Sequence, residues 1–272
     1  MKFAGLAGVL LAVAAVSPST ASAQEQWSFA LTPYLWLPNI NGTLKYSLPP
    51  GGNGAPEAAV GPNDYLQNLQ AALMLAAEAR NGKWSVVSDF IYLDFGSQES
   101  SVKAVNFGSP VVDTSLSTST RSSLTGVQWM LAGGYTMIQA PSGTLDLLGG
   151  FRYLGIEATT DWQLASTVNG PSGGQTFPAS GSIAQRTDLW DAIVGVRGRL
   201  RLGESRWFAP YHLDVGAGSS RLTWQGAAGI AYAFKWGDAT LGYRHLYYDQ
   251  SGDKLVQNFR FSGPSVGVSF RF

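Results

Sequence analysis

Apolar and polar residues alternate along the last ten residues of the chain, whose sequence is G-P-S-V-G-V-S-F-R-F. From Ser265 onward, valine or phenylalanine fills every second position, and serine, glycine or arginine fills the positions between them. This period of two predicts a β-strand whose two faces lie in different surroundings. A long apolar strand left at the edge of a sheet would aggregate unless another strand covered it. We therefore expect the last strand to pair with the first and to close the sheet into a barrel.

Similar patterns along the chain predict about ten strands. These are expected at residues 27–37, 69–80, 84–97, 116–138, 144–165, 186–202, 207–218, 222–235, 239–248 and 256–272. Residues 69–80 also have good helix propensity, and a helix there would reduce the count to eight. The alternation in this segment and the hairpin signal Asn81-Gly82 favour a strand. Twelve strands would result if residues 41–47 paired as a separate hairpin.

The connections between these segments fall into two classes. Short connections at 81–83, 139–143, 203–206 and 236–238 alternate with mostly long ones at 39–68, 98–115, 166–184 and 249–255. In bacterial outer-membrane barrels the short turns lie in the periplasm and the long loops lie outside the cell. The predicted fold class is therefore all-β, a closed antiparallel transmembrane β-barrel with both termini on the periplasmic side.

Residues 1–23 predict a secretory signal peptide. Lys2 precedes an apolar run from Phe3 to Val16, and Ala21-Ser22-Ala23 forms a small-residue cleavage site. The run is too short for a membrane anchor, so residues 24–272 are expected to form one mature barrel domain. Removal of Lys2 takes the 18 Lys and Arg residues to 17, against 18 acidic residues. This balance gives no charge excess for nucleic acid, and the absence of cysteine suits an oxidising periplasm.

Aromatic residues lie near both ends of the predicted strands. Aromatic rings favour the level of the lipid headgroups, and belts of them mark both faces of a membrane. The expected periplasmic belt contains Trp27, Trp84, Tyr135, Trp207, Trp236 and Phe272, and the expected outer belt contains Trp36, Tyr92, Trp162, Trp190, Trp224 and Tyr247. These belts predict the bacterial outer membrane as the location and its lipid as a partner.

Several motifs resemble those of a family of uncharacterised outer-membrane β-barrel proteins of Gram-negative bacteria. The motifs include G-F-R-Y at 150–153, D-A-I-V-G-V-R-G-R at 191–199, G-Y-R-H-L at 242–246 and the closing segment described above. The resemblance implies the barrel fold and the outer-membrane location. It carries no established activity, so it transfers no catalytic residue. Phe272 resembles the terminal signal that the barrel-assembly machinery reads, which implies that machinery as a partner.

The alternation also predicts which charged residues face the lumen. Charges at membrane depth are tolerated when they face a wet or paired interior, so we expect a lumen charge network of arginines and carboxylates. Its expected members are Glu78, Arg80, Asp89, Asp146, Arg152, Asp191, Arg197, Arg199, His212, Asp214 and Arg244. Counting from the short turns places Asp89, Arg197, His212 and Arg244 near one level, at roughly 3.3 Å per residue.

Three functions compete for this network. The first is structural, because a ten-stranded barrel is narrow enough for its own side chains to plug it. The second is a narrow porin-like channel for small solutes, anions among them, since charged rings set pore selectivity. The third is a lipid- or peptide-modifying enzyme using His212 with Asp214, or His245 with Asp249. The two histidines and the absence of a recognised catalytic motif argue against an enzyme, and we expect no metal or cofactor.

Overall fold

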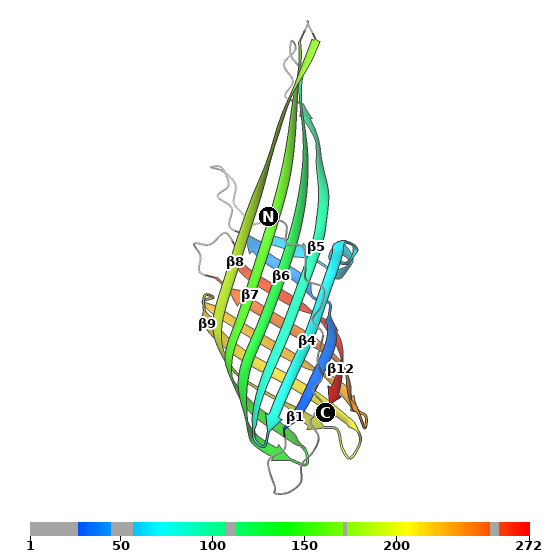
Figure 1. Cartoon of the computed structure of the whole chain (residues 1–272), viewed down its shortest axis with the longest axis vertical. Helices are drawn as coiled ribbons and strands as arrows, with labels where there is room; N and C mark the ends of the chain where they lie inside the picture. The colour runs from blue at the N-terminus through cyan, green and yellow to red at the C-terminus, as the bar shows by residue number, and fades with distance from the viewer. Residues whose placement is uncertain (1–26, 45–56, 107–112, 171–172, 251–255) are drawn as a thin grey trace.

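A computed structural model describes residues 27–44, 57–106, 113–170, 173–250 and 256–272. The expected signal peptide and its cleavage site lie outside the described residues. The described part folds as an antiparallel sheet in which each strand bonds to the next along the chain, apart from the short β2 and β3 (Figure 1). Pairing of β1 with β12 closes the sheet into a ring of ten strands. The expected closure of the last strand on the first is confirmed.

The ten strands of the ring match the predicted segments closely at the end that carries the short turns. They are β1 (Ser28–Trp36), β4 (Leu69–Asn81), β5 (Trp84–Asn106), β6 (Asp113–Ala140), β7 (Gly143–Gly170), β8 (Gly173–Arg201), β9 (Trp207–Gly218), β10 (Leu222–Ala233), β11 (Gly237–Asp249) and β12 (Val256–Arg271). The short-turn end, as we call it, also holds Phe272, whose backbone exchanges two hydrogen bonds with Phe29.

The segment that could have been a helix is the strand β4, so the eight-stranded alternative is wrong. It pairs with β1 on one side and β5 on the other. Pairing with two neighbours satisfies its backbone groups, and this tertiary context outweighs helix propensity. A hairpin does form from β2 (Asn39–Leu44) and β3 (Glu57–Val60). It leaves the ring at ten strands, because β2 takes over from β1 along the edge of β12.

The point at which β12 changes its partner from β1 to β2 depends on a close backbone approach. Trp36 pairs with Ser265 and Asn39 pairs with Ser262, so Leu37 and Pro38 pass beside Gly263. A Cβ atom on Gly263 would lie 2.1 Å from the Leu37 carbonyl oxygen and 2.7 Å from the Pro38 Cα. Only glycine fits where two backbones approach this closely.

Two predicted loops are strands in the structure. Residues 98–106 continue β5, and residues 113–115 belong to β6, where we had expected a loop over 98–115. Residues 166–170 and 173–184 likewise belong to β7 and β8 rather than to a loop. The serine, threonine and glycine content suggested turns, but each strand finds a paired neighbour along its whole length. In Figure 1 these four strands rise as a narrow sheet far above the ring.

Short elements link the β2–β3 hairpin back to the ring. The helix α1 (Pro62–Tyr65) and the 3-10 helix η1 (Leu66–Asn68) precede β4. No helix in the described part of the chain is long and apolar enough to cross a membrane. At the short-turn end, Gly82 and Gly203 have φ angles of +57° and +69°, which favour glycine in the tight turns.

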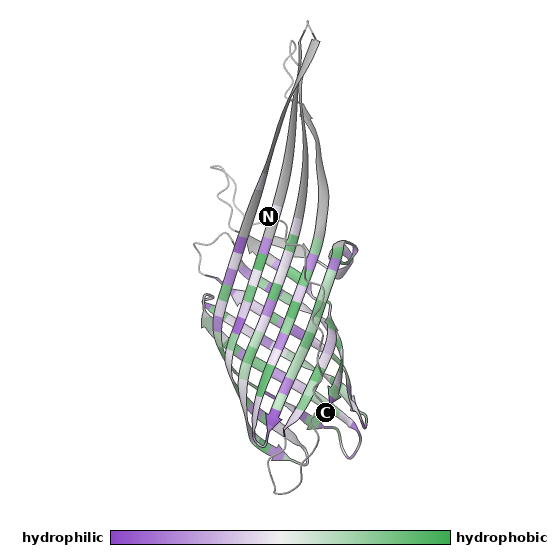
Figure 2. Ribbon diagram, in the orientation of Figure 1, coloured by the Kyte–Doolittle hydropathy of each residue, from purple (hydrophilic) through white to green (hydrophobic). Residues whose placement is uncertain are grey.

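Alternation along the strands separates an apolar outer face from a mixed lumen, and Figure 2 shows it as changing colour along each ribbon. The exposed large apolar side chains include Leu147, Val194, Leu213, Leu241 and Val266. Exposed rings gather at the short-turn end, where Trp236 stacks on both Phe234 and Phe270. Trp36 does not belong to the outer belt where we expected it. It has an exposure of 4%, and its indole Nε1 donates to the Gly263 carbonyl, because position 36 has the inward phase of β1.

Candidate functional site in the barrel lumen

Charged side chains from the three strands β4, β7 and β8 meet in the lumen at the short-turn end. The Arg80 guanidinium donates to Glu78 at 2.9 Å, to Asp146 at 2.5 Å and to the Thr136 hydroxyl at 2.6 Å. Arg197 pairs with Glu78 at 2.8 Å and with Asp146 at 3.6 Å. We call Glu78, Arg80, Asp146 and Arg197 the lower cluster. Its two arginines share its two carboxylates, so the cluster is neutral.

A second set of charges crosses the lumen nearer the long strands. Arg244 pairs with Asp89 at 2.8 Å and donates to Gln225 at 2.7 Å. Tyr34 donates its hydroxyl proton to Asp89 at 2.5 Å and accepts a bond from Arg244 at 3.1 Å. The guanidinium also lies 4.7 Å from the centre of the Trp36 ring. Strands β1, β5, β10 and β11 therefore meet around one buried cation.

The third set centres on Arg152. Its Nη2 donates to both carboxylate oxygens of Asp214, at 2.7 and 2.6 Å, and its Nη1 donates to Thr223 at 3.2 Å. His212 Nε2 lies 2.6 Å from the same carboxylate. Gln225 joins this set to the Arg244 set, because its Oε1 accepts from both arginines. We call Tyr34, Asp89, Arg152, Asp214, Gln225 and Arg244 the plug.

An apolar layer lies next to the plug on the side of the long strands. Its members are Trp36, Met74, Ile91, Leu154, Leu189, Leu246 and Tyr248. Leu189 and Leu246 are 1% exposed, and Tyr248 is fully buried. At this height a polar and an apolar layer of side chains lie next to each other, and Arg152 within them has no exposed surface.

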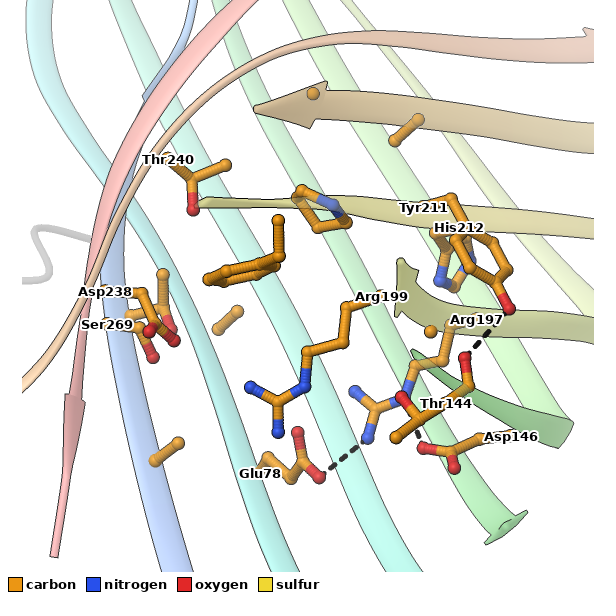
Figure 3. Close-up of a pocket in the computed structure, with 18 of the residues that line it drawn as sticks. Glu78, Thr144, Asp146, Arg197, Arg199, Tyr211, His212, Asp238, Thr240 and Ser269 are labelled. Carbon is orange, nitrogen blue, oxygen red and sulfur yellow. Dashed lines mark hydrogen bonds and ion pairs between the residues drawn. The ribbon is translucent and has the colours of Figure 1, made fainter. Parts of the chain in front are cut away.

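Below the plug, the lumen widens into a chamber of about 620 Å³ at the short-turn end. A second cavity of about 320 Å³ continues upward to Asp89 and Arg244 and shares Glu78, Arg197 and His212 with the chamber. Arg199 extends into the chamber beside Arg197 (Figure 3). Its guanidinium lies 5.7 Å from the centre of the Phe208 ring. On the opposite wall, Arg271 pairs with Asp238.

The structure places all eleven expected network residues in or beside the lumen, with different partners. Arg197 stands across from His212 in the β8–β9 pairing, as the turn at 203–206 predicts. Asp191 is buried but accepts a backbone bond from Ser220 at 2.7 Å, and within the described residues no ion pair involves it. Arg152 is its neighbour across the sheet, yet the arginine reaches Asp214 instead.

Sequence reasoning missed Tyr34, Gln225, Asp238 and Arg271 as members of the network. Tyr34 and Gln225 carry no charge, so a search for charged inward residues passed over them. Asp238 was assigned to a turn, although it shares the inward phase of Arg244 on β11. Within the described residues, no three histidine, cysteine, aspartate or glutamate side chains gather where they could hold a metal ion.

The chain is similar to several solved structures of outer-membrane proteins. The outer membrane protease OmpT from Escherichia coli matches with a TM-score of 0.50 and 11% identity, over 94% of this chain and 100% of OmpT. The translocator domain of the autotransporter NalP from Neisseria meningitidis matches with a TM-score of 0.34 and 14% identity, over 90% of this chain and 88% of that one. Neisserial surface protein A matches with a TM-score of 0.29 and 13% identity, over 90% and 97%.

No family model and no curated protein matches the chain. At 11% identity the likeness to OmpT shows the fold. The closed ring, the apolar outer face and the buried Arg/Asp network within it make the chain a bacterial outer-membrane β-barrel.

Proposed function

We propose that this protein is a non-conducting outer-membrane barrel, whose plugged lumen makes it a rigid anchor for the strands that continue beyond the membrane. The single observation that supports the proposal is the pair of adjacent layers of buried side chains inside the ring. Arg152, Thr223 and Tyr248 have no exposed surface, and Leu189 and Leu246 have 1%. A solvent path would have to cross these residues. Arg152 and Arg244 are each held by several hydrogen bonds.

The energetics of the plug also support a structural role. Removing one partner of a buried ion pair costs about 3–5 kcal/mol, because the other charge stays buried without compensation. Arg152 and Asp214 form two hydrogen bonds with each other, and neither side chain has any exposed surface. Opening a pore here would break such contacts one after another. The network thus favours one closed arrangement of the surrounding strands.

The long strands are the part of the protein that the rigid barrel would hold in position. Strands β5 to β8 continue as a paired sheet well past the ring, as Figure 1 shows. In our orientation the short turns face the periplasm, so this sheet stands outside the cell. Segments that project from a rigid barrel are the usual place for contacts with other molecules.

Conductance in a planar lipid bilayer tests the closed lumen. Purified folded barrel should give no steady single-channel current at any voltage the membrane tolerates. A porin reconstituted in the same bilayer should conduct, which shows that insertion works. Steady, voltage-independent steps from the wild-type protein would overturn the proposal.

A narrow channel for small anionic solutes is the second candidate. The arginines of the chamber favour it, because charged rings select the ions that enter a pore. It requires Arg152 and Arg244 to leave their partners so that the chamber opens through the plug. Steps in the conductance experiment that vanish when sulfate replaces chloride would support this second candidate.

We also propose that the protein is not an enzyme. His212 is the one histidine beside a lumen carboxylate among the described residues, but both oxygens of Asp214 already accept from Arg152. An orienting carboxylate committed to a guanidinium is a poor partner for a general base. Protease and lipase assays should give the same background for the wild type and a His212→Ala variant. Activity that the variant loses would contradict the proposal.

A further inference from the structure

We propose that the chamber at the short-turn end is a binding site for a small organic anion with a single carboxylate, held by Arg199. The site lies below the plug and opens toward the periplasm in our orientation. The proposal does not need the lumen to conduct, because the ligand would enter and leave by the same end. A sealed barrel can therefore carry a receptor-like site on its periplasmic side.

The charge balance of the chamber is the first argument. Four arginines line it, namely Arg80, Arg197, Arg199 and Arg271, and three carboxylates face them, namely Glu78, Asp146 and Asp238. Arg80 and Arg197 share Glu78 and Asp146, and Arg271 takes Asp238. Among the described residues, no ion pair or hydrogen bond joins the Arg199 side chain to another residue. One positive charge is therefore left for a ligand.

The position of Arg199 is the second argument. The alternation of β8 sends Arg197 and Arg199 into the lumen together, and Figure 3 shows both side chains reaching toward Glu78. Arg197 reaches its carboxylates, whereas the Arg199 guanidinium lies over the Phe208 ring. A guanidinium presents a planar fork of donors that fits a carboxylate with two parallel bonds. The Phe208 ring adds a cation–π contact on one side of the guanidinium.

The walls of the chamber define the rest of the ligand. Its volume of about 620 Å³ lies in the range of small-molecule sites. Apolar side chains line part of it, among them Ala30, Ala76, Phe208 and Pro210, while Thr240 and Ser269 add hydroxyl groups. An anion with a compact apolar body would bury that body against the alanines and the ring. Inorganic ions would leave those surfaces in water.

Fluorine NMR with 4-fluorobenzoate tests the proposal directly. The folded barrel in zwitterionic micelles should broaden the fluorine signal in a saturable way, and unlabelled benzoate should reverse the broadening. The neutral isostere 4-fluorobenzamide should bind at least about tenfold more weakly, since it lacks the charge that pairs with a guanidinium. Protein-free micelles give the background for both probes.

A matched pair of variants assigns the site. Arg199→Gln should weaken 4-fluorobenzoate binding at least about tenfold, because the charge-assisted bonds are lost. Arg201→Gln is the control, since Arg201 stands two residues further along β8, is exposed and does not line the chamber. Equal affinity for the acid and the amide in the wild type would overturn the proposal without any variant. Wild-type affinity in Arg199→Gln, or no saturable binding at all, would also overturn it.

Discussion

At the scale of single residues, the plug is a set of buried charges that each have more than one partner. Gln225 has no charge, yet its Oε1 connects Arg152 to Arg244 and so joins two ion pairs into one network. Buried networks of this kind are strong when every member is paired and costly when one member is removed. The same logic separates the plug from the rim, where Arg186 pairs with Asp188 in solvent.

Replacing Arg152 by methionine should therefore destabilise the folded barrel by about 3 kcal/mol, because Asp214 would stay buried with His212 alone. Urea unfolding in lipid vesicles, followed by tryptophan fluorescence, measures the change. The matched control is Arg186→Met, which breaks an exposed pair and should cost about 1 kcal/mol or less. Adding Asp214→Leu to Arg152→Met should recover part of the loss. Equal effects of Arg152→Met and Arg186→Met would refute the role of the plug.

At the scale of strands, closure of the ring depends on one irregular point. β1 and β2 form an interrupted strand along β12, and the interruption at Leu37 and Pro38 needs space that only Gly263 leaves. Proline is tolerated there because it has no N–H group to offer the ladder. The hairpin of β2 and β3 starts at this point and stays bonded to β12 through β2.

Gly263→Ala should lower the folded fraction several-fold, because the new methyl group would overlap the Leu37 carbonyl oxygen and the Pro38 backbone. In a detergent gel of unheated samples, folded barrels migrate faster than unfolded chains. The intensities of the two bands therefore measure the folded fraction. Gly149→Ala is the matched control, since a Cβ atom there meets nothing within 4 Å. If both variants fold as well as the wild type, then the close approach at Gly263 does not limit closure.

The sequence predicts strands well where one face meets lipid and the other meets the lumen. The bounds of β9 and the closure through β12 follow from alternation and turn chemistry alone. The signal weakens beyond the ring, where both faces of β5 to β8 leave the apolar band. A serine- and threonine-rich strand there has the composition of a loop, and backbone pairing decides the outcome.

The site was predictable to the same extent. Alternation places Arg197 and Arg199 inside, and the turn at 203–206 places Arg197 opposite His212. Alternation does not predict which carboxylate each long arginine side chain contacts across the lumen. Asp191 is the nearest neighbour of Arg152 in the sheet, but the guanidinium crosses to β9. The prediction for Trp36 was wrong because it relied on the position of the ring at a strand end and not on its phase, which is inward on β1.

At the scale of the whole molecule, the chain is asymmetric from end to end. The short-turn end carries the chamber, a collar of exposed rings and Phe272, which is 73% exposed and stacks on Phe29. The other end carries the plug, the apolar layer and the long paired strands. The location of every inferred activity therefore depends on the orientation of the barrel in the membrane.

The chain has no cysteine, so single introduced cysteines can report that orientation without background. Ser142 lies in the turn between β6 and β7, and Ser219 lies at the opposite end between β9 and β10, both exposed. On intact cells, a membrane-impermeant maleimide should label Ser219→Cys and leave Ser142→Cys unlabelled, because the short-turn end, which holds Ser142, faces the periplasm in our orientation. Permeabilised cells should give equal labelling of both. The reverse pattern on intact cells would contradict this orientation and would place the Arg199 chamber outside the cell.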